Sequence, residues 1–304
     1  MKINLKYIKC PICESDNNYK ILYKKNFKLS NLNTKIFSAR RLPDKIHYQL
    51  VKCNQCGLVR STPVVDIKYL SQLYKKSLLT YDDEINNLTT SYINSVKPIL
   101  KKLAKNAKIL EIGCGNGFVL KAIYDLGYRN VFGIEPSTDA ISKSNSKIKK
   151  NIVTDILKPA LFDKESFDFI FFFQTFDHIP EPNKFLKECN QLLKTNGHIL
   201  AFNHNVDSFS SKLLGEKSPI IDIEHAFLYS PKTIKTIFKK NGFTINKVYS
   251  PKNTLSIKHL FWLLPIPKNI KQKIVKSNLN ILDKKINIKL GNVCIEGQKN
   301  ENKI

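Results

Sequence analysis

The stretch Lys108-Ile-Leu-Glu111-Ile-Gly113-Cys-Gly115-Asn-Gly117 decides the fold of this chain. Its apolar first half predicts a buried strand, and its three alternating glycines let the backbone turn sharply and approach a ligand without side-chain clashes. A dinucleotide fingerprint counted from Gly113 needs its third glycine where this chain has Phe118, and the sequence contains no GxxxxGK pattern of a P-loop. The sequence therefore disfavours NAD and P-loop nucleotides as ligands.

Short apolar strands alternate with amphipathic helices on both sides of this turn, which predicts an α/β fold with a parallel, doubly wound sheet. The strands of this alternation are expected at Lys108–Ile112, Val131–Glu135, Ile152–Asp155, Phe167–Phe173 and His198–Asn203. The helices are expected at Phe118–Leu126, Thr138–Lys147, Asn183–Leu193 and Pro231–Asn241. Two late strands, Phe243–Tyr249 and Asn292–Gly297, complete a seven-stranded sheet as its expected antiparallel edge.

At these residues the chain resembles the class I S-adenosylmethionine-dependent methyltransferases. Their first motif, E-x-G-x-G-x-G, is matched without a gap by Glu111, Gly113, Gly115 and Gly117. Three later segments match in the family's order: Gly133-Ile-Glu135, Val153-Thr-Asp155-Ile156, and Phe167–Phe173 with the loop that begins at Gln174. The resemblance implies a Rossmann-like sheet that binds S-adenosylmethionine beyond the carboxyl ends of its strands.

The resemblance also implies roles for the matched side chains. Glu135 corresponds to the acidic residue that takes both ribose hydroxyls, which suits a carboxylate because it can accept two hydrogen bonds at once. Glu111 is expected to bind loop amides and the amino end of the cofactor. Asp155 is expected to accept from the adenine amine, with Ile156 beside it, and Gln174 completes the expected cofactor site.

Four of the seven cysteines form two knuckles, Cys10-Pro-Ile-Cys13 and Cys53-Asn-Gln-Cys56. In an intracellular protein, two C-x-x-C pairs are typical of a tetrahedral zinc site, and four thiolates leave no position for water, so the zinc is expected to be structural. A redox dithiol is the alternative. We therefore expect a zinc-binding lobe over residues 1–60, a helical connector over 61–107, and a methyltransferase domain over 108–304 with an insertion at 251–291.

The acceptor side carries two acidic-histidine pairs, Asp177-His178 and Glu224-His225. With the cysteine lobe, they resemble the sugar C-methyltransferases that act on nucleotide-linked keto sugars, although the additional C-terminal domain of that family is missing here. The resemblance implies catalytic roles for His178, Glu224 and His225, and a sugar or nucleotide-sugar acceptor in polysaccharide biosynthesis. His204, after the fifth strand, is a secondary candidate base. The choice between C- and O-methylation stays open.

The net charge of +25 raises a second possibility, an RNA methyltransferase. Residues 1–60 carry 13 basic and 3 acidic side chains, and residues 231–304 carry 16 and 3, so the excess lies in the flanks. Only four of the 50 basic residues are arginine, the better phosphate ligand, which favours a solvated lysine coat over a nucleic-acid surface. A non-catalytic cofactor-binding protein is a third alternative.

The insertion contains an apolar stretch, Leu255–Pro267, with lysines within and after it up to Lys273. We expect a lid over the acceptor pocket or a homodimer contact, and a peripheral membrane contact through residues 255–273 is the alternative. A monomer is equally compatible with the sequence. No apolar run reaches the roughly 18 residues of a membrane span, and no secretory signal is visible, which predicts a cytoplasmic protein.

Overall fold

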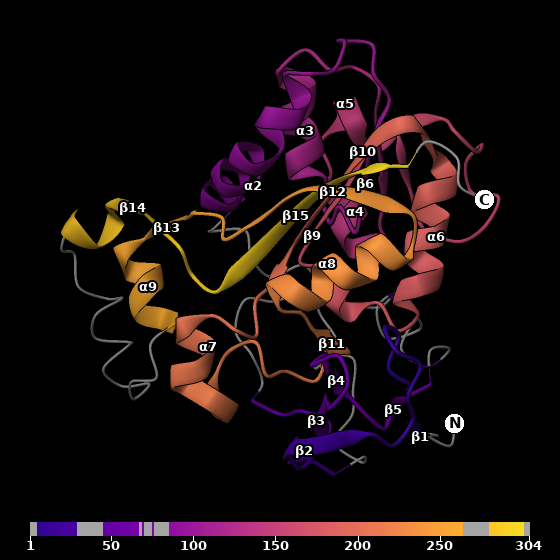
Figure 1. The fold of residues 1–304 in the computed structure, drawn as a ribbon. Coiled ribbons are helices and arrows are strands. Elements are labelled where there is room, and N and C mark those ends of the chain that lie inside the picture. Colours follow the sequence, from indigo (N-terminus) through magenta and orange to yellow (C-terminus); the bar gives the residue numbers. More distant parts are fainter. Residues whose placement is uncertain are drawn as a thin grey trace.

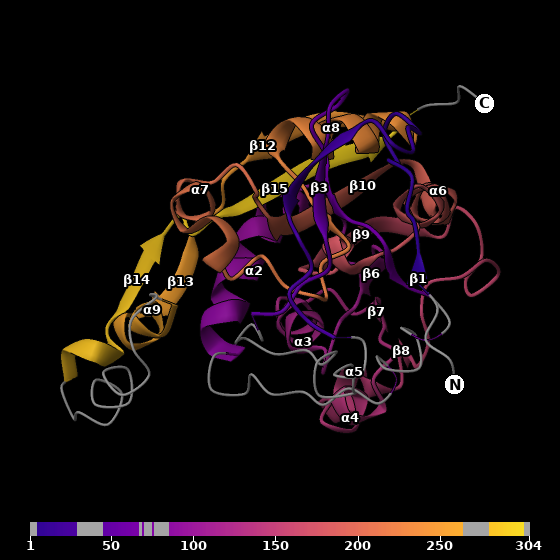
Figure 2. The same cartoon turned by 90° about the horizontal axis from the view of Figure 1, so that it is seen from below.

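A computed structural model describes residues 5–28, 45–66, 85–263 and 280–300, together with Tyr69 and Lys75 (Figure 1). Its centre is a seven-stranded sheet, as the sequence predicts, with the order β12-β15-β10-β9-β6-β7-β8. The strands are β6 (Ile109–Ile112), β7 (Val131–Ile134), β8 (Ile152–Val153), β9 (Phe167–Phe173), β10 (Leu193–His204), β12 (Phe243–Tyr249) and β15 (Asn292–Lys299). In Figure 2 the strands β9, β6, β7 and β8 follow one another down the view.

The prediction of a two-stranded antiparallel edge is wrong in its arrangement. Only β15 runs antiparallel, and it lies between β10 and β12. The edge strand β12 therefore runs parallel to β10 and the four strands beyond it. The physical reason is that α8 (Pro231–Lys240) returns the chain to the start of β12 in the usual crossover manner, whereas β15 arrives from the opposite direction after the insertion.

Helices cover both faces of the sheet. Phe185 and Leu186 of α6 (Pro182–Leu192) pack with α8 and with Phe172 on one face. Residues of α2 (Ile85–Leu100) and α3 (Phe118–Asp125) pack on the other, around Phe169 and Phe171. Because successive side chains of a strand point to opposite faces, β9 contributes phenylalanines to both core clusters. This double burial explains why its sequence is a nearly unbroken apolar run.

Two helices differ from what their sequences favour. The helix expected at Thr138–Lys147 is split into α4 (Thr138–Ser142) and α5 (Ser146–Lys149), because the Asn145 side chain accepts from the amide of Lys147 and starts a new helix. Proline favours the first turn of a helix, but Pro98 lies in the last turn of α2, whose Val96 and Ile99 are buried. Burial of these apolar neighbours outweighs the hydrogen bond that proline removes.

The N-terminal residues build a small β lobe below the sheet in Figure 1. Its strands are β1 (Leu5–Lys6), β2 (Tyr19–Tyr23), β3 (Leu50–Cys53), β4 (Val59–Ser61) and β5 (Val64–Val65). The lobe sheet has the order β11-β4-β3-β2, so its outer strand β11 (Phe227–Leu228) comes from the distant segment before α8. The lobe is thus joined by main-chain pairing to the segment that precedes α8.

The insertion supplies a second small sheet, β13 (Asn253–Ser256) with β14 (Lys285–Ile288), and two helical segments, α9 (Ile257–Leu263) and the 3-10 helix η5 (Asn280–Asp283). It is anchored to α2, because the amide of Thr254 donates to the Ser91 hydroxyl at 2.8 Å. Residues 264–279, which include part of the predicted lid or membrane stretch, lie outside the described residues. No helix in the described part of the chain is both long and apolar enough to cross a bilayer.

Candidate active site

The glycine loop connects β6 to α3 at the carboxyl edge of the sheet. Gly113, Gly115 and Gly117 all have positive φ angles, of 73°, 55° and 72°. A Cβ at Gly113 would lie 2.5 Å from the Thr175 hydroxyl oxygen, and one at Gly117 would lie 2.4 Å from an Ile148 methyl carbon. The turn therefore requires glycine at these positions for conformation and for space.

Glu135 follows β7 and holds this loop in place. One carboxylate oxygen accepts from the Gly115 amide at 2.8 Å, and the other accepts from the Ser137 amide at 2.8 Å. The sequence assigned the loop amides to Glu111, so that assignment is corrected: the partner of the loop is Glu135. Burial raises the pKa of Glu135, and the two amides partly offset this effect.

Glu111 is buried at the end of β6, with its side chain inside the protein. Burial, and then the negative charge of Glu135, raise its pKa well above the usual range. Within the part of the chain that the structure describes, its Oε2 atom has no hydrogen-bond partner, and neither have two other buried acceptors, Asn116 Oδ1 and Gln174 Oε1. Unsatisfied buried acceptors near two carboxylates fit a ligand that brings N–H donors and positive charge.

Asp155 and Ile156 follow β8 at the far edge of the sheet. Asp155 accepts from the amide of Ile156 at 2.8 Å and also contacts Lys158. The Ile156 side chain is largely exposed. Both residues lie at the same carboxyl edge as Glu135, and their contact with an adenine ring stays a prediction.

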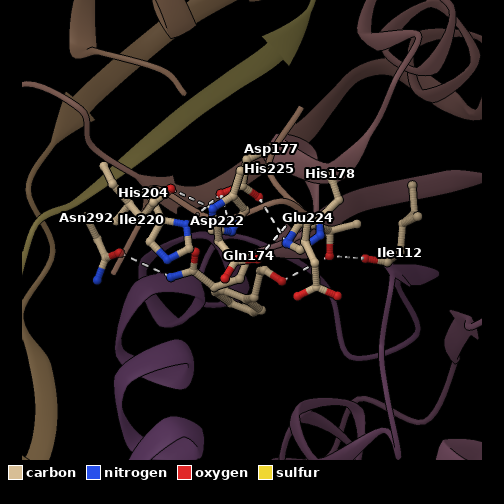
Figure 3. A network of polar contacts seen from close by, with 12 residues as sticks. Ile112, Gln174, Asp177, His178, His204, Ile220, Asp222, Glu224, His225 and Asn292 are labelled. Atoms are coloured by element: carbon tan, nitrogen blue, oxygen red, sulfur yellow. Dashed lines mark hydrogen bonds and ion pairs between the residues drawn. The ribbon is translucent and has the colours of Figure 1, made fainter. Parts of the chain in front are cut away.

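A cluster of three histidines surrounds one carboxylate at this edge (Figure 3). Asp177 lies in the short 3-10 helix η3 (Phe176–His178) after β9 and is only 1% exposed. Its Oδ2 accepts from His204 Nδ1 at 2.6 Å. His178 Nε2 lies 3.8 Å from Asp177 Oδ1, and His225 Nε2 lies 4.0 Å from Oδ2. The structure thus brings His178 and His225 together, as predicted catalytic residues would require.

Asp177 lies at the centre of the cluster, but the sequence did not indicate a catalytic role for it. The sequence indicated His204 only as a secondary candidate base. Burial would raise the pKa of Asp177, but the hydrogen bond from His204 and the nearby histidines hold it far below the usual range. Burial lowers the pKa of His178 to about 3 and also lowers that of His225. The cluster at neutral pH is therefore an ionised carboxylate among imidazoles of which these two are neutral.

Glu224 precedes His225 in the chain and is half-buried. Its amide donates to Asp222 Oδ1 at 3.1 Å, which shapes the turn before His225. His225 Nδ1 lies 2.8 Å from the Ile220 carbonyl oxygen, so Nδ1 carries the proton and Nε2 keeps the lone pair. Of the three predicted catalytic residues, the two histidines face Asp177, and Glu224 flanks them in Figure 3.

The lobe holds the histidine cluster through β4 and β11. The Ser61 hydroxyl donates to the His225 carbonyl at 2.9 Å, and the Ser61 amide donates to the Ala226 carbonyl at 2.9 Å. The Ala226 amide in turn donates to the Asp177 carbonyl at 2.9 Å. The segment that carries His225 is therefore fixed between the lobe and η3.

The four predicted zinc ligands form one cluster. Cys10 and Cys56 have sulfur atoms 3.4 Å apart, as do Cys13 and Cys53, and all four sulfurs lie within 4.8 Å of one another. A tetrahedral zinc ion with Zn–S bonds of ~2.3 Å places sulfurs about 3.8 Å apart, so the cluster fits this ion closely. Burial raises the pKa of the Cys53 thiol, but hydrogen bonds, first from the Cys56 amide, lower it to about 6 overall.

The chain matches the family described as "Methyltransferase domain" over residues 86–248. It is 31% identical over 158 residues to the ubiquinone biosynthesis O-methyltransferase of Pelagibacter ubique, an alignment that covers 48% of this chain and 65% of that protein. The corresponding enzyme of Glaesserella parasuis is 29% identical over 143 residues, with 43% and 58% covered. The chain thus spans less than two thirds of the length of these curated relatives.

Solved structures share the fold at low identity. A chain of the complex between a methyltransferase activator and a candidate methyltransferase of Haloferax volcanii is 15% identical, with a TM-score of 0.51 over 72% of this chain and 95% of that one. A candidate methyltransferase from Bacillus halodurans is 14% identical, with a TM-score of 0.50 over 68% and 100%. The family match covers more than half of the chain and includes the glycine loop, Glu135 and Asp177, so the protein belongs to the methyltransferase domain family.

Proposed function

We propose that this methyltransferase uses S-adenosylmethionine as its methyl donor and methylates a hydroxyl group of a small-molecule acceptor. The observation that carries the proposal is the pair of Asp177 and His204, with 2.6 Å between carboxylate oxygen and Nδ1. The pair lies close to the glycine loop, because Thr175, two residues before Asp177, is the side chain that a Cβ at Gly113 would meet. A base and a cofactor loop at one edge of the sheet suit transfer between two bound molecules.

The cofactor side is assigned to the residues around the glycine loop. Glu111, Asn116 and Gln174 offer unsatisfied acceptors to the ammonium end, and Glu135 can exchange its amide partners for ribose hydroxyls. When bound, S-adenosylmethionine supplies a sulfonium methyl group that is displaced in line by a nucleophile. The task of the protein is therefore to align the two reactants and to remove a proton.

His204 is the proposed general base. Its Nδ1–H donates to Asp177, which leaves the Nε2 lone pair for the acceptor. His204 Nε2 would take the hydroxyl proton while the acceptor oxygen displaces the sulfonium and is methylated. The Asp177 charge stabilises the resulting imidazolium. His178 is a poor base, because its pKa of about 3 leaves little affinity for the proton.

Two acceptor classes follow from different observations. The curated relatives are O-methyltransferases of ubiquinone biosynthesis, which favours a phenolic hydroxyl. The four-cysteine lobe and the Glu224-His225 pair occur together in this chain, as in the sugar C-methyltransferases that it resembles, and this favours a sugar-linked acceptor. We rank the phenolic class first, because the O-methyltransferases are 31% and 29% identical to this chain over 158 and 143 residues.

A structural zinc ion is part of the proposal. Cys10, Cys13, Cys53 and Cys56 would hold it and tie the two knuckles together, with no open position for chemistry. The ion would stabilise the lobe that orients His225.

The test is transfer of a labelled methyl group from S-adenosylmethionine to a panel of catechols, nucleotide sugars and total RNA. We expect label in the catechol arm, and a loss of about 10²- to 10⁴-fold in His204→Gln, the usual contribution of a general base. His198→Gln is the matched control, because His198 lies in the same strand β10 but outside the cluster. Full activity of His204→Gln would refute the base, and label confined to RNA would refute the acceptor class.

A further inference from the structure

We propose that Asp177, His178 and His225 form a second metal site, separate from the cysteine cluster, for a divalent transition-metal ion. The three ligand atoms, a carboxylate oxygen and two imidazole nitrogens, lie within 4.8 Å of one another. Two histidines and one carboxylate are a set that binds such ions in proteins and leaves coordination positions open. This inference does not depend on the proposed methyl transfer, because it concerns binding alone.

The distances allow one ion to reach all three side chains. His178 Nε2 is 3.8 Å from Asp177 Oδ1, and His225 Nε2 is 4.0 Å from Asp177 Oδ2. Metal–nitrogen and metal–oxygen bonds of ~2.0–2.2 Å connect ligand atoms up to about 4.2 Å apart. Only small movements of the rings are needed, and the His178 side chain is 21% exposed, which gives it room to move.

The surroundings already orient the ligands as a metal site requires. His225 Nδ1 is bonded to the Ile220 carbonyl at 2.8 Å, which directs the unprotonated Nε2 toward Asp177. His204 Nδ1 holds Asp177 Oδ2 and so fixes the plane of the carboxylate. Such outer hydrogen bonds to ligating imidazoles and carboxylates accompany most protein metal sites.

The buried carboxylate of Asp177 also supports a metal ion at this site. Asp177 is 1% exposed, and its Oδ1 has no hydrogen-bond partner among the described residues. A buried ionised carboxylate needs a compensating positive charge or hydrogen bonds on both oxygens. A divalent cation bound at Oδ1 would supply that charge.

The ligand set predicts the type of ion. Two imidazoles favour Zn²⁺, Co²⁺, Fe²⁺, Mn²⁺ or Ni²⁺ over Mg²⁺ and Ca²⁺, which prefer oxygen ligands. The His178 and His204 side chains are each about one fifth exposed, at 21% and 24%, so the ion would lie near the mouth of the site. An acceptor hydroxyl bound there would have a lowered pKa and would lie close to His204.

Titration of the metal-free full-length chain with Co²⁺ separates the two clusters. Cobalt bound to the cysteines gives a sulfur-to-metal charge-transfer band, and cobalt bound to two histidines and a carboxylate gives only weak d–d bands. We expect two ions per chain in the wild type and one in Asp177→Asn and in His178→Gln, with the charge-transfer band retained. Cys13→Ser should lose the charge-transfer band, which assigns that band to the cysteine cluster.

His198→Gln is the control and should bind two ions, because His198 is outside both clusters. Far-ultraviolet circular dichroism and S-adenosylmethionine binding check that the variants are folded, and His178→Gln is the milder substitution if Asp177→Asn is not. One ion per chain in the wild type, or two ions in a folded His178→Gln variant, would overturn the proposal.

Discussion

The cysteine cluster and the histidine cluster are assembled in different ways. The cysteines come from two short knuckles, and each knuckle is fixed by its own backbone: the Gly57 amide donates to the Cys53 carbonyl at 3.0 Å, and the Glu14 amide donates to the Cys10 carbonyl at 2.8 Å. The histidines come from three separate segments, after β9, at the end of β10 and before β11. The first cluster is a local structure, and the second exists only in the folded molecule.

The histidine cluster nevertheless depends on the lobe that carries the cysteine cluster. The β4 strand of the lobe pairs with β11, and Ser61 binds the backbone of His225 and Ala226. Loss of the lobe should therefore disturb the histidine site. The glycine loop and Glu135 are positioned by β6, β7 and α3, so the cofactor side should be less sensitive to the lobe, although Leu110 and Ile134 share a buried core with Leu58 of the lobe. The histidine site and the cofactor side should therefore respond differently to loss of the lobe.

The largest effect is expected from Cys13→Ser. Structural zinc contributes on the order of 10 kcal/mol to small zinc-dependent folds, so loss of one thiolate should release the ion and unfold the lobe. Methyl transfer should become undetectable, because His225 loses its support. Metal analysis, limited proteolysis and the transfer assay measure this. Ser15→Ala is the control, since its hydroxyl contacts Cys13 Sγ at 3.3 Å without being a ligand. An active, zinc-free variant would break the coupling.

Asp177→Asn should affect the acceptor side alone. The amide cannot stabilise a protonated His204, so kcat/KM should fall by about 10²- to 10⁴-fold, or roughly 3–5 kcal/mol. Steady-state kinetics with the labelled donor measure the loss. Asp168→Asn is the matched control on β9, because Asp168 contacts Lys194 and the Lys108 amide at the opposite end of that strand. Equal activity of the two variants would contradict the role of Asp177.

Glu135→Ala should affect the cofactor side alone. Hydrogen bonds to a charged group are worth about 1.5–3 kcal/mol, so S-adenosylmethionine should bind about 10- to 150-fold more weakly. Titration calorimetry gives the change in Kd, and Glu165→Ala, whose carboxylate contacts Lys299 at the surface, should leave it unchanged. A larger change in the acceptor KM than in the cofactor Kd would mean that Glu135 serves the other side.

The last prediction concerns the pH dependence of stability. The unfolded chain protonates His178 near its ordinary pKa of 6.5, whereas the folded chain does so only near 3. Stability should therefore fall as the pH decreases from about 6.5 toward 3, with a contribution of up to about 1.4 kcal/mol per pH unit. The lowered pKa of Asp177 adds a loss only below about 3.8, its ordinary range.

Urea unfolding at pH 7.5, 6 and 5 isolates this contribution. The free energy of unfolding of His178→Gln should fall less steeply than that of the wild type. Acid release of metal from the cysteines is common to both proteins and cancels in the difference. An ion at the histidine site would be carried by the wild type alone, so the titrations are run without added transition metal. Identical slopes would show that His178 titrates normally in the folded chain.

The contrast between a locally built cluster and one assembled from distant segments also explains which features could be predicted from the sequence. The cysteine knuckles and the E-x-G-x-G-x-G turn are short-range patterns, in which spacing alone determines which side chains meet. The seven strands were also recognisable, because burial on both faces makes β9 an apolar run. The split after Ser142 was missed, because an Asn145 cap competes with a continuous helix through a single side-chain hydrogen bond.

Asp177 and the place of β15 were not predictable in this way. Asp177 becomes the hub only when β9, β10 and the segment before β11 bring three histidines to one carboxylate. Likewise, the sequence of β15 does not reveal that it enters between β10 and β12, since strand order depends on crossover geometry rather than on composition. The hydrogen bond from the Gly115 amide to Glu135, and not to Glu111, likewise depends on how the loop after β6 lies beside β7.

Titration calorimetry of S-adenosylmethionine into the wild type and into Cys13→Ser tests most directly whether the chain binds this cofactor independently of the lobe. We predict one binding site per chain in both proteins with Kd values within about threefold, because the glycine loop is held by its hydrogen bond to Glu135 and not by a residue of the lobe. NAD should show no binding heat, since Phe118 replaces the third glycine of its fingerprint. If the wild type bound NAD and did not bind S-adenosylmethionine, the assignment of the glycine loop to S-adenosylmethionine would be wrong.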